Sequence, residues 1–406
     1  MANNRIYFAN QQLVFRRDSS TGDETTAANR WTVAHGVQSV AVTTTFNLEQ
    51  AFELGQLAIY ENIEGVPDIE LTASKVLDGY PLLYHLATQG GATLVSPTLA
   101  GRSNEKCVVG IGIWPDTVDS AGQAGNINPA QQMEMSGMFA SSVGYNFPLE
   151  DNFTEDLTLV GNNKGWKSTT CANIPWTMDL ESGQFPGNDD GPIATGDNAV
   201  QQDIGGTNPV SQLGGVNRRE NMKFAAANAA DAGGEDYTYL PTEIPGVSAS
   251  GWMNPKSATE AAHVQSITVS TDLGREELFE LGTRQPYARI VTFPVEVTCD
   301  IEVISISGDL IDAYADGCAD STAPCSGVAD NLTAQKIRLV TCEGTSIYLG
   351  TKNKLSSVNY GGGDAGGGNV TVTYSYSTFN DFTVVHPQDP ADSGYDWWAN
   401  RADWLT

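Results

Sequence analysis

Apolar and polar residues alternate along much of this chain, which predicts a protein built mainly from β-strands. Within 37–44, Val40, Val42 and Thr44 occupy every second position, and within 300–307 apolar residues alternate with polar ones, as in Asp300-Ile-Glu-Val303. This period of two is the pattern of a strand with one buried face. We therefore expect a mainly β fold in which short strands are joined by turns rich in glycine, asparagine and aspartate.

The first of these strand patterns occurs twice. Residues 37–60 match 264–287 at 11 of 24 positions without a gap, and both copies contain the string Phe-Glu-Leu-Gly, at 52–55 and 279–282. Further blocks follow in the same order in both halves: 69–72 matches 295–298, 141–145 matches 356–360, and 157–159 matches 372–374. A repeated block order indicates two copies of one structural unit.

The repeat divides the chain into five parts. We call 37–166 module 1 and 264–385 module 2, with an N-terminal extension over 1–36 and a tryptophan-rich tail over 386–406. The segment 167–262 has no counterpart in the repeat and is rich in Gly, Asn, Asp and Pro. It is a linker or an arm that becomes ordered against a neighbouring subunit, and the arm is the favoured interpretation.

Within each module the pattern predicts strands, one short helix and further strands. Phe-Glu-Leu-Gly is expected to begin a second extended run, with its glycine at a bulge or a backbone bend in mid-strand. Apolar spacing predicts a helix over 77–87, with a counterpart over 309–314. The expected fold class is therefore two tandem β-sandwich or barrel modules, each with a short flanking α-helix, plus a long loop-rich insertion.

Charge narrows the choice of partners. The chain has 49 acidic and 21 basic residues and a net charge of −28, which argues against a surface that grips nucleic-acid phosphates or anionic membranes. The same charge fits either simple solubility or a field that repels DNA. The N-terminal residues have no apolar run of signal-peptide length, and no stretch approaches the ~20 apolar residues of a membrane span.

The sequence lacks a recognisable catalytic set, so we expect no enzyme, no cofactor and no metal. No pair among the four histidines has a metal-ligand spacing, and neither a Walker-type loop nor a nucleophile elbow is present. The glycine run 361–368 is expected to form a hairpin tip. Cys318 and Cys325 could bridge locally or bind a metal, but two free thiols are favoured.

Three segments resemble the tail tube (major tail) proteins of tailed bacteriophages: 52–70, 75–80 and 152–161. The resemblance covers both modules and implies β-sandwich modules that close, six at a time, into stacked rings around a genome conduit. Two modules per chain imply a trimeric ring with pseudo-sixfold symmetry, and a ring of six chains is the rival. The implied location is the virion tail, assembled in the host cytoplasm, with other tail proteins as partners and double-stranded DNA passing without specific binding.

The resemblance also suggests candidate residues for assembly or for the lumen. The extended run after Phe-Glu-Leu-Gly is the expected lumen wall or subunit seam. The candidates are Glu53, Glu280, Tyr60, Tyr287, Trp397, Trp398 and Trp404. Two other functions compete with a tube subunit. One is another virion part, such as a distal-tail, tail-completion or decoration protein, and the other is a carbohydrate-binding β-sandwich, which the eight tryptophans would suit.

Overall fold

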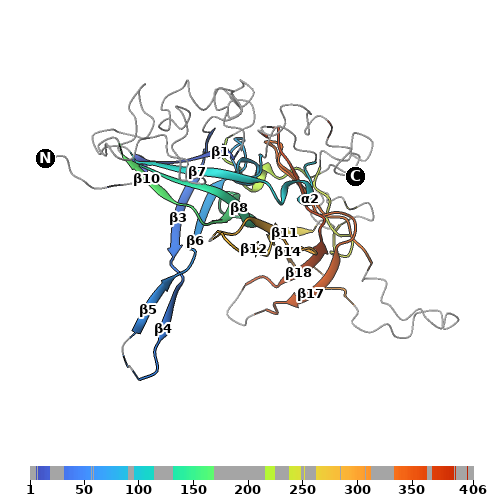
Figure 1. The fold of residues 1–406 in the computed structure, drawn as a ribbon. Coiled ribbons are helices and arrows are strands. Elements are labelled where there is room, and N and C mark those ends of the chain that lie inside the picture. The colour runs from blue at the N-terminus through green and yellow to red at the C-terminus, as the bar shows by residue number, and fades with distance from the viewer. Residues whose placement is uncertain are drawn as a thin grey trace.

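The computed structural model describes most of the two modules and part of the segment between them. The described residues are 6, 8–18, 32–55, 57, 59–89, 96–113, 131–168, 215–224, 237–247, 251, 262–283, 285–306, 308–311, 333–363, 368–387, 389 and 400. These residues form a mainly β structure with short helices, which confirms the predicted fold class (Figure 1).

The elements fall into two sets, one before and one after the central segment. The first set is η1 (Phe8–Asn10), β1 (Gln11–Arg17), β2 (Thr32–Val33), β3 (Val37–Thr45), β4 (Leu48–Phe52), β5 (Ile59–Glu64), β6 (Asp68–Val76), α1 (Leu83–Ala87), α2 (Leu99–Arg102), β7 (Lys106–Ile113), β8 (Gln131–Pro148), β9 (Thr154–Gly161) and β10 (Gly165–Ser168). The second set is η3 (Arg219–Asn221), β11 (His263–Asp272), β12 (Arg275–Leu278), β13 (Ala288–Val291), β14 (Glu296–Ile304), β15 (Arg338–Val340), β16 (Ser346–Tyr348), β17 (Lys354–Tyr360), β18 (Thr371–Phe379) and β19 (Thr383–Val385).

Eight strands form one continuous antiparallel sheet that runs through both modules. Their order is β3-β6-β9-β8 from module 1, followed by β11-β14-β18-β17 from module 2. The first and second strands of each module pair around a bulge at matched glutamines, Gln38 and Gln265. The third and fourth strands pair around a bulge at Ser141 in module 1 and at Ser356 in module 2. Both halves therefore have the same strand order and the same irregularities.

Strand registers correct two of the sequence matches by two residues. Ile69 pairs with Thr44, and Val297 pairs with the matched Thr271, so Ile69 corresponds to Val297 and not to Val295. In the same way the block 157–159 corresponds to 374–376 and not to 372–374. A displacement of two residues leaves every side chain on the same face of a strand. Alternation alone could not detect the error.

A second β layer covers one face of the sheet. The N-terminal part of β8 pairs with β7 and β10, and β1 and β2 extend this layer beyond β7. In module 2 the corresponding layer is the sheet β15-β16-β19. In the inner strands β6, β9, β11, β14 and β18, alternate residues are buried toward these layers, whereas the edge strands β3 and β17 have none that is fully buried. The buried apolar side chains of both modules form one cluster.

The helices are shorter than predicted. Within 77–87 only Leu83–Ala87 is helical, and α1 contacts β1, β7, β8 and β9. The expected counterpart over 309–314 begins in non-helical backbone, since Leu310 has φ of 53°, and 312–314 lie outside the described residues. A left-handed residue interrupts a right-handed helix, which explains why the apolar spacing misled there.

The described part of 167–262 packs on its own chain. The Asn217 backbone amide donates to the Leu77 carbonyl, and the Asn217 carbonyl accepts from the Phe153 amide, both in module 1. Tyr239 pairs through its backbone with Arg338 on β15 of module 2, in both directions. Residues 215–224 and 237–247 therefore connect module 1 and module 2 within one chain. Whether the remainder contacts a neighbouring subunit stays a prediction, because it lies outside the described residues.

Each Phe-Glu-Leu-Gly string lies at the tip of a β-hairpin. The hairpins are β4–β5 and β12–β13, and Gly55 and Gly282 adopt φ of 97° and 99° in the turns. The prediction of a mid-strand bulge was wrong, because these positive φ values reverse the chain direction. In Figure 1 β4–β5 extends well away from the main sheet, whereas β12–β13 lies close to it.

Candidate assembly interface

The two modules are joined by a strand pair, β8 with β11. The pair runs from Ser266 opposite Pro148 to Asp272 opposite Ser142 without a bulge. At its centre Val269 lies opposite Tyr145, and both side chains are buried in the core. Antiparallel backbone pairing with buried side chains on one face fixes the register strongly, because a one-residue slip would expose the core residues.

The outer strands of the sheet are repeat-matched to that joined pair. β3 is matched to β11, and β17 is matched to the C-terminal part of β8. Among the described residues β3 pairs only with β6, and β17 pairs only with β18. Tyr360 on β17 is 51% exposed, whereas its counterpart Tyr145 is 1% exposed. Two edge strands of a long sheet therefore present backbone groups and a partly apolar face to any further strand.

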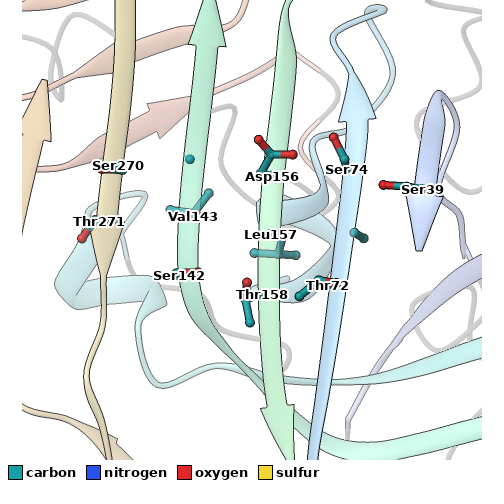
Figure 2. A pocket seen from close by; sticks show the side chains of 12 residues that line it. Ser39, Thr72, Ser74, Ser142, Val143, Asp156, Leu157, Thr158, Ser270 and Thr271 are labelled. Atoms are coloured by element: carbon teal, nitrogen blue, oxygen red, sulfur yellow. The ribbon is translucent and has the colours of Figure 1, made fainter. Parts of the chain in front are cut away.

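The face of the sheet away from the core is polar and acidic. Rows of opposed side chains cross the strands, such as Asp156 opposite Gly144, which is opposite Ser270. The acidic residues on this face are Asp68, Glu70, Asp156, Asp272, Glu296, Asp300 and Glu302, all exposed or half-buried. Figure 2 shows a pocket on this face that reaches from module 1 across the junction to β11 of module 2, lined by Ser39, Thr72, Ser142, Asp156, Ser270 and Thr271 among others. Small hydroxyl side chains thus separate the carboxylates.

The predicted candidate residues lie elsewhere. Glu53 and Glu280 are at the tips of the two hairpins and not on the acidic face, although they do occupy equivalent places. Tyr60 lies on β5 and Tyr287 just before β13, and both are exposed. The tail candidates Trp397, Trp398 and Trp404 lie outside the described residues, as do Cys318 and Cys325. The alternation of Thr, Ser, Asp and Glu along the strands was the signal for the acidic face.

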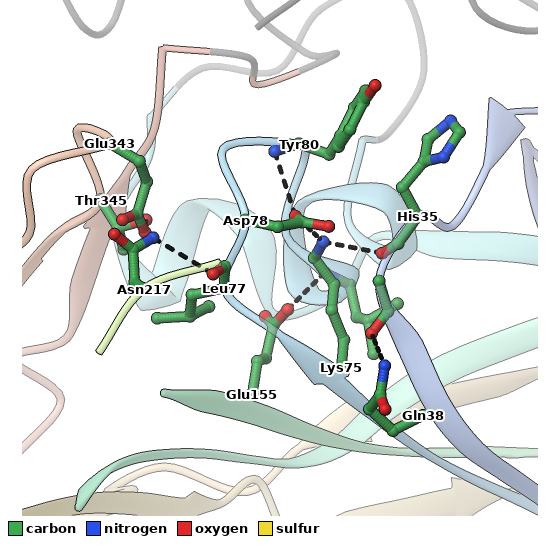
Figure 3. A network of polar contacts seen from close by, with 12 residues as sticks. His35, Gln38, Lys75, Leu77, Asp78, Tyr80, Glu155, Asn217, Glu343 and Thr345 are labelled. Atoms are coloured by element: carbon green, nitrogen blue, oxygen red, sulfur yellow. Dashed lines mark hydrogen bonds and ion pairs between the residues drawn. The ribbon is translucent and has the colours of Figure 1, made fainter. Parts of the chain in front are cut away.

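A buried polar network lies on the core side of the sheet, beside α1. The Lys75 ammonium donates to Asp78 Oδ1 at 2.5 Å and to the His35 carbonyl at 2.7 Å. The Glu155 carboxylate accepts the Leu83 and Tyr84 backbone amides and the Tyr145 hydroxyl. Burial raises the pKa of Glu155, while these donors act against that rise. Glu155 thus caps the start of α1 from a neighbouring strand (Figure 3).

A second buried cluster joins α1 and α2 of module 1 to residues 384–389. Arg102 forms an ion pair with Asp389, and both side chains are fully buried. His85 Nε2 lies 3.1 Å from the Val384 carbonyl, so this nitrogen carries the proton. Burial lowers the pKa of His85 to about 4 and holds that of His386 well below its ordinary value. Both imidazoles are therefore neutral at pH 7, and both are fully buried.

The described residues contain neither a candidate metal site nor a membrane-spanning helix. There, no group of three or more His, Cys, Asp and Glu side chains could hold a metal ion. In the same part of the chain, no helix is long and apolar enough to cross a membrane.

Comparison with known proteins gives only distant structural similarities. No protein-family model matches the chain, and no curated protein matches its sequence. Among solved structures, the cap of the anti-feeding prophage tube is similar over 42% of this chain and 95% of its own, with 11% identity and a TM-score of 0.28. The sheath-tube complex of an extracellular contractile injection system, PVC, gives 11% identity and a TM-score of 0.27 over 41% of this chain and 94% of that one. The anti-feeding prophage baseplate gives 10% identity and a TM-score of 0.29 over 42% and 99%. These neighbours are parts of tail-like assemblies, but scores this low carry no conclusion about this chain.

Proposed function

We propose that this chain is the structural subunit of a phage-type tail tube. Copies join through their edge strands into a ring, rings stack into a tube, and the acidic sheet face lines the lumen. The chain acts by assembly, without a catalytic site or cofactor. In this proposal the chain is located in the virion tail, and other tail proteins bind the ends of the tube.

The observation that carries the proposal is the β8–β11 pair inside one chain. It joins the last strand of one module to the first strand of the next, and the same two kinds of strand, β17 and β3, remain at the outer edges. Repeating the internal junction between chains is a heterologous contact, which closes into a ring when the rotation allows it. Within the chain Val269 lies opposite Tyr145 and Ser270 opposite Gly144. The repeat-matched residues would then pair between copies, with Val42 opposite Tyr360 and Thr43 opposite Asn359 of the next copy.

Three chains would supply six modules, which is the number that the tail-tube resemblance implies. In such a ring the eight-stranded sheets form one barrel, and each chain contributes seven carboxylates to one side of it, including Asp156 and Asp300. A lumen of one charge sign repels phosphates of the same sign, so DNA would slide without binding. Closure of the sheet would also remove both exposed edges, which are otherwise sites of aggregation.

Electron microscopy of the purified full chain, over a range of protein concentrations, tests the proposal. We expect rings with threefold symmetry and six similar lobes, stacked into open-ended tubes. A cysteine pair tests the register: Thr43→Cys with Asn359→Cys should give disulfide-linked oligomers. Thr43→Cys with Ser357→Cys is the matched control, because diagonal positions lie about 7–8 Å apart. Each single variant controls for the native thiols.

Two results would overturn the proposal. The first is a chain that remains monomeric at all concentrations and forms no linked species. The second is linkage that is equal in the matched and the diagonal pairs, which would indicate random collision and not a defined strand pair. A single capping ring that never stacks would point to another structural part of a tail.

A further inference from the structure

The two hairpins of the repeat have different surroundings, although they are built alike. Leu48 pairs with Glu64 in β4–β5, and Arg275 pairs with Val291 in β12–β13, so repeat-matched residues occupy the same places. The β12–β13 hairpin contacts module 1 of its own chain, whereas β4–β5 extends away from the sheet (Figure 1). Among the described residues, β12–β13 packs against a surface of its own chain, which we call its receptor, and β4–β5 has no such receptor.

The first anchor of β12–β13 is at its base. Leu273 is fully buried, and its backbone amide donates to the Ser141 carbonyl at 2.7 Å. Arg275 donates from Nε to the Ala140 carbonyl at 2.8 Å, and its guanidinium lies 5.1 Å from the centre of the Phe139 ring. The hairpin therefore supplies the buried Leu273 side chain and the Arg275 cation, and module 1 supplies the Phe139 ring.

The second anchor is on the returning strand. Arg289 donates to Asn162 Oδ1 at 3.0 Å and lies 3.5 Å from Asp68 Oδ1. Gln285 Nε2 donates to Asn163 Oδ1 at 2.9 Å. These polar contacts complete the seat of the hairpin on module 1.

The corresponding side of β4–β5 is apolar and exposed. Phe46 stands where Leu273 stands, Leu48 replaces Arg275, and Asn62 replaces Arg289. Phe46 is 70% exposed and Leu48 is 59% exposed. The arginines that seat the second hairpin are thus absent from the first, and large apolar groups take their place.

The receptor side changes in the opposite sense. The register equates Phe139 with Lys354, Ala140 with Leu355, and Asn162 with Phe379. Phe379 is 54% exposed. Within the chain the hairpin supplies the cation, Arg275, and module 1 supplies the apolar group, Phe139. In the repeat-matched pair the hairpin supplies the apolar group, Leu48, and module 2 supplies the cation, Lys354.

We propose that the β4–β5 hairpin of one copy docks on module 2 of the neighbouring copy, over Lys354, Leu355 and Phe379. Phe46 takes the buried place that Leu273 has within the chain, and Leu48 lies against the stem of Lys354. This inference rests on the proposed pairing of β3 with β17. In that register Thr45 lies opposite Ser357, so the hairpin begins beside Ser356 and Leu355 of the neighbour.

The exchange also sets the order of modules around a ring. If β12–β13 of one copy met module 2 of another, Arg275 would lie beside Lys354, and like charges in a desolvated contact are costly. Module 2 therefore accepts β4–β5 and rejects β12–β13. The ring must alternate module 1 and module 2, even though the two sheets are similar enough to pair in other orders.

The test uses the full chain and measures the concentration at which oligomers form, by sedimentation velocity. Leu48→Arg should raise that concentration by about tenfold or more, because it brings a second cation to Lys354. Leu48→Arg with Lys354→Phe recreates the internal Arg275–Phe139 pair and should restore assembly. Ile63→Arg, on the opposite face of the same hairpin, is the matched control and should change little. Circular dichroism of each variant confirms folding.

The outcomes separate this inference from the ring proposal. If Thr43→Cys/Asn359→Cys still links copies but Leu48→Arg assembles as the natural chain does, edge pairing stands and the docking site is wrong. If Leu48→Arg blocks assembly and Lys354→Phe does not rescue it, the receptor assignment is wrong. If neither assembly nor linkage is found in the natural background, both proposals fall. Rescue together with a silent Ile63→Arg supports the docking site.

Discussion

At the scale of single residues, His85 links the stability of the module junction to pH. Its folded-state pKa of about 4 lies below the ordinary 6.5 because burial disfavours the cation; nearby Asp389 partly opposes this lowering, and Arg102 adds to it. The unfolded chain therefore binds more protons between these pH values. Stability is fully present above about pH 6.5 and falls as the pH drops toward 4.

Replacing this imidazole should flatten part of the pH profile. His85→Gln retains a donor for the Val384 carbonyl but cannot be protonated. Between about pH 7 and pH 4.5 we expect the natural chain to lose about 2–3 kcal/mol more unfolding free energy than the variant. Urea denaturation at both pH values measures this. His263→Gln, at an exposed histidine of β11, is the control, and equal profiles for His85→Gln and the natural chain would contradict the assignment.

Charge on the acidic face can be changed without touching the core. Asp300→Lys with Glu302→Lys moves the net charge from −28 to −24, since each substitution adds two charges. We expect assembly to persist and short duplex DNA to co-sediment with the particles at low salt, because basic patches bind phosphates. Glu150→Lys with Asp151→Lys, in the turn after β8, makes the same net change elsewhere. DNA retained equally by both variants would argue against a lumen at the sheet face.

At the scale of elements, strand content was predictable and hairpin geometry was not. Alternation over 37–44 and 300–307 identified strands that the structure contains, because one buried face imposes a period of two. The two copies of Phe-Glu-Leu-Gly follow a strand pattern and predict a continued extended run, but both lie at hairpin turns. Their leucines are fully exposed, and alternation within a single chain does not report whether another copy would cover them.

The acidic face shows the same limit for the candidate site. Its residues are spread over β6, β9, β11 and β14, so no local motif marks them. The two halves of the face, on β6 and β9 and on β11 and β14, join into one face through the β8–β11 pair. The sequence indicated the net charge and the repeat. Identifying the face that carries the charge requires the pairing register of the strands, and the sequence matches were displaced by two residues in β14 and β18.

The hairpin tips should act in stacking and not in ring closure. Leu54 and Leu281 are exposed by 103% and 104%, and each precedes the turn glycine. Apolar tips of this kind are stable when another surface covers them. Leu54→Ser with Leu281→Ser should leave rings intact and shorten tubes in electron micrographs. Tubes as long as those of the natural chain would show that the tips stay in solvent.

At the scale of the whole molecule, the junction between the two modules of one chain is a template for the proposed contact between copies. The internal junction shows a strand pair, a hairpin seat and a buried polar cluster, whereas the outer edges present the matching halves of the first two. Duplication followed by divergence at Arg275 and Lys354 would convert six equal contacts into two alternating kinds. An alternating ring needs fewer independent subunits to close, which lowers the translational and rotational entropy lost in assembly.

Assembly of so acidic a chain should depend on salt in a definite direction. Each copy carries a net charge of −28, so bringing copies together raises mutual repulsion, which salt screens over a Debye length of about 10 Å at 0.1 M. The proposed contacts are backbone pairing and apolar burial, which salt does not weaken. The oligomerisation concentration should therefore fall as sodium chloride rises from about 0.02 to 0.5 M, measured by sedimentation velocity. A rise instead would mean that charge pairs hold the copies together, which neither the β3–β17 edges nor the β4–β5 hairpin would supply.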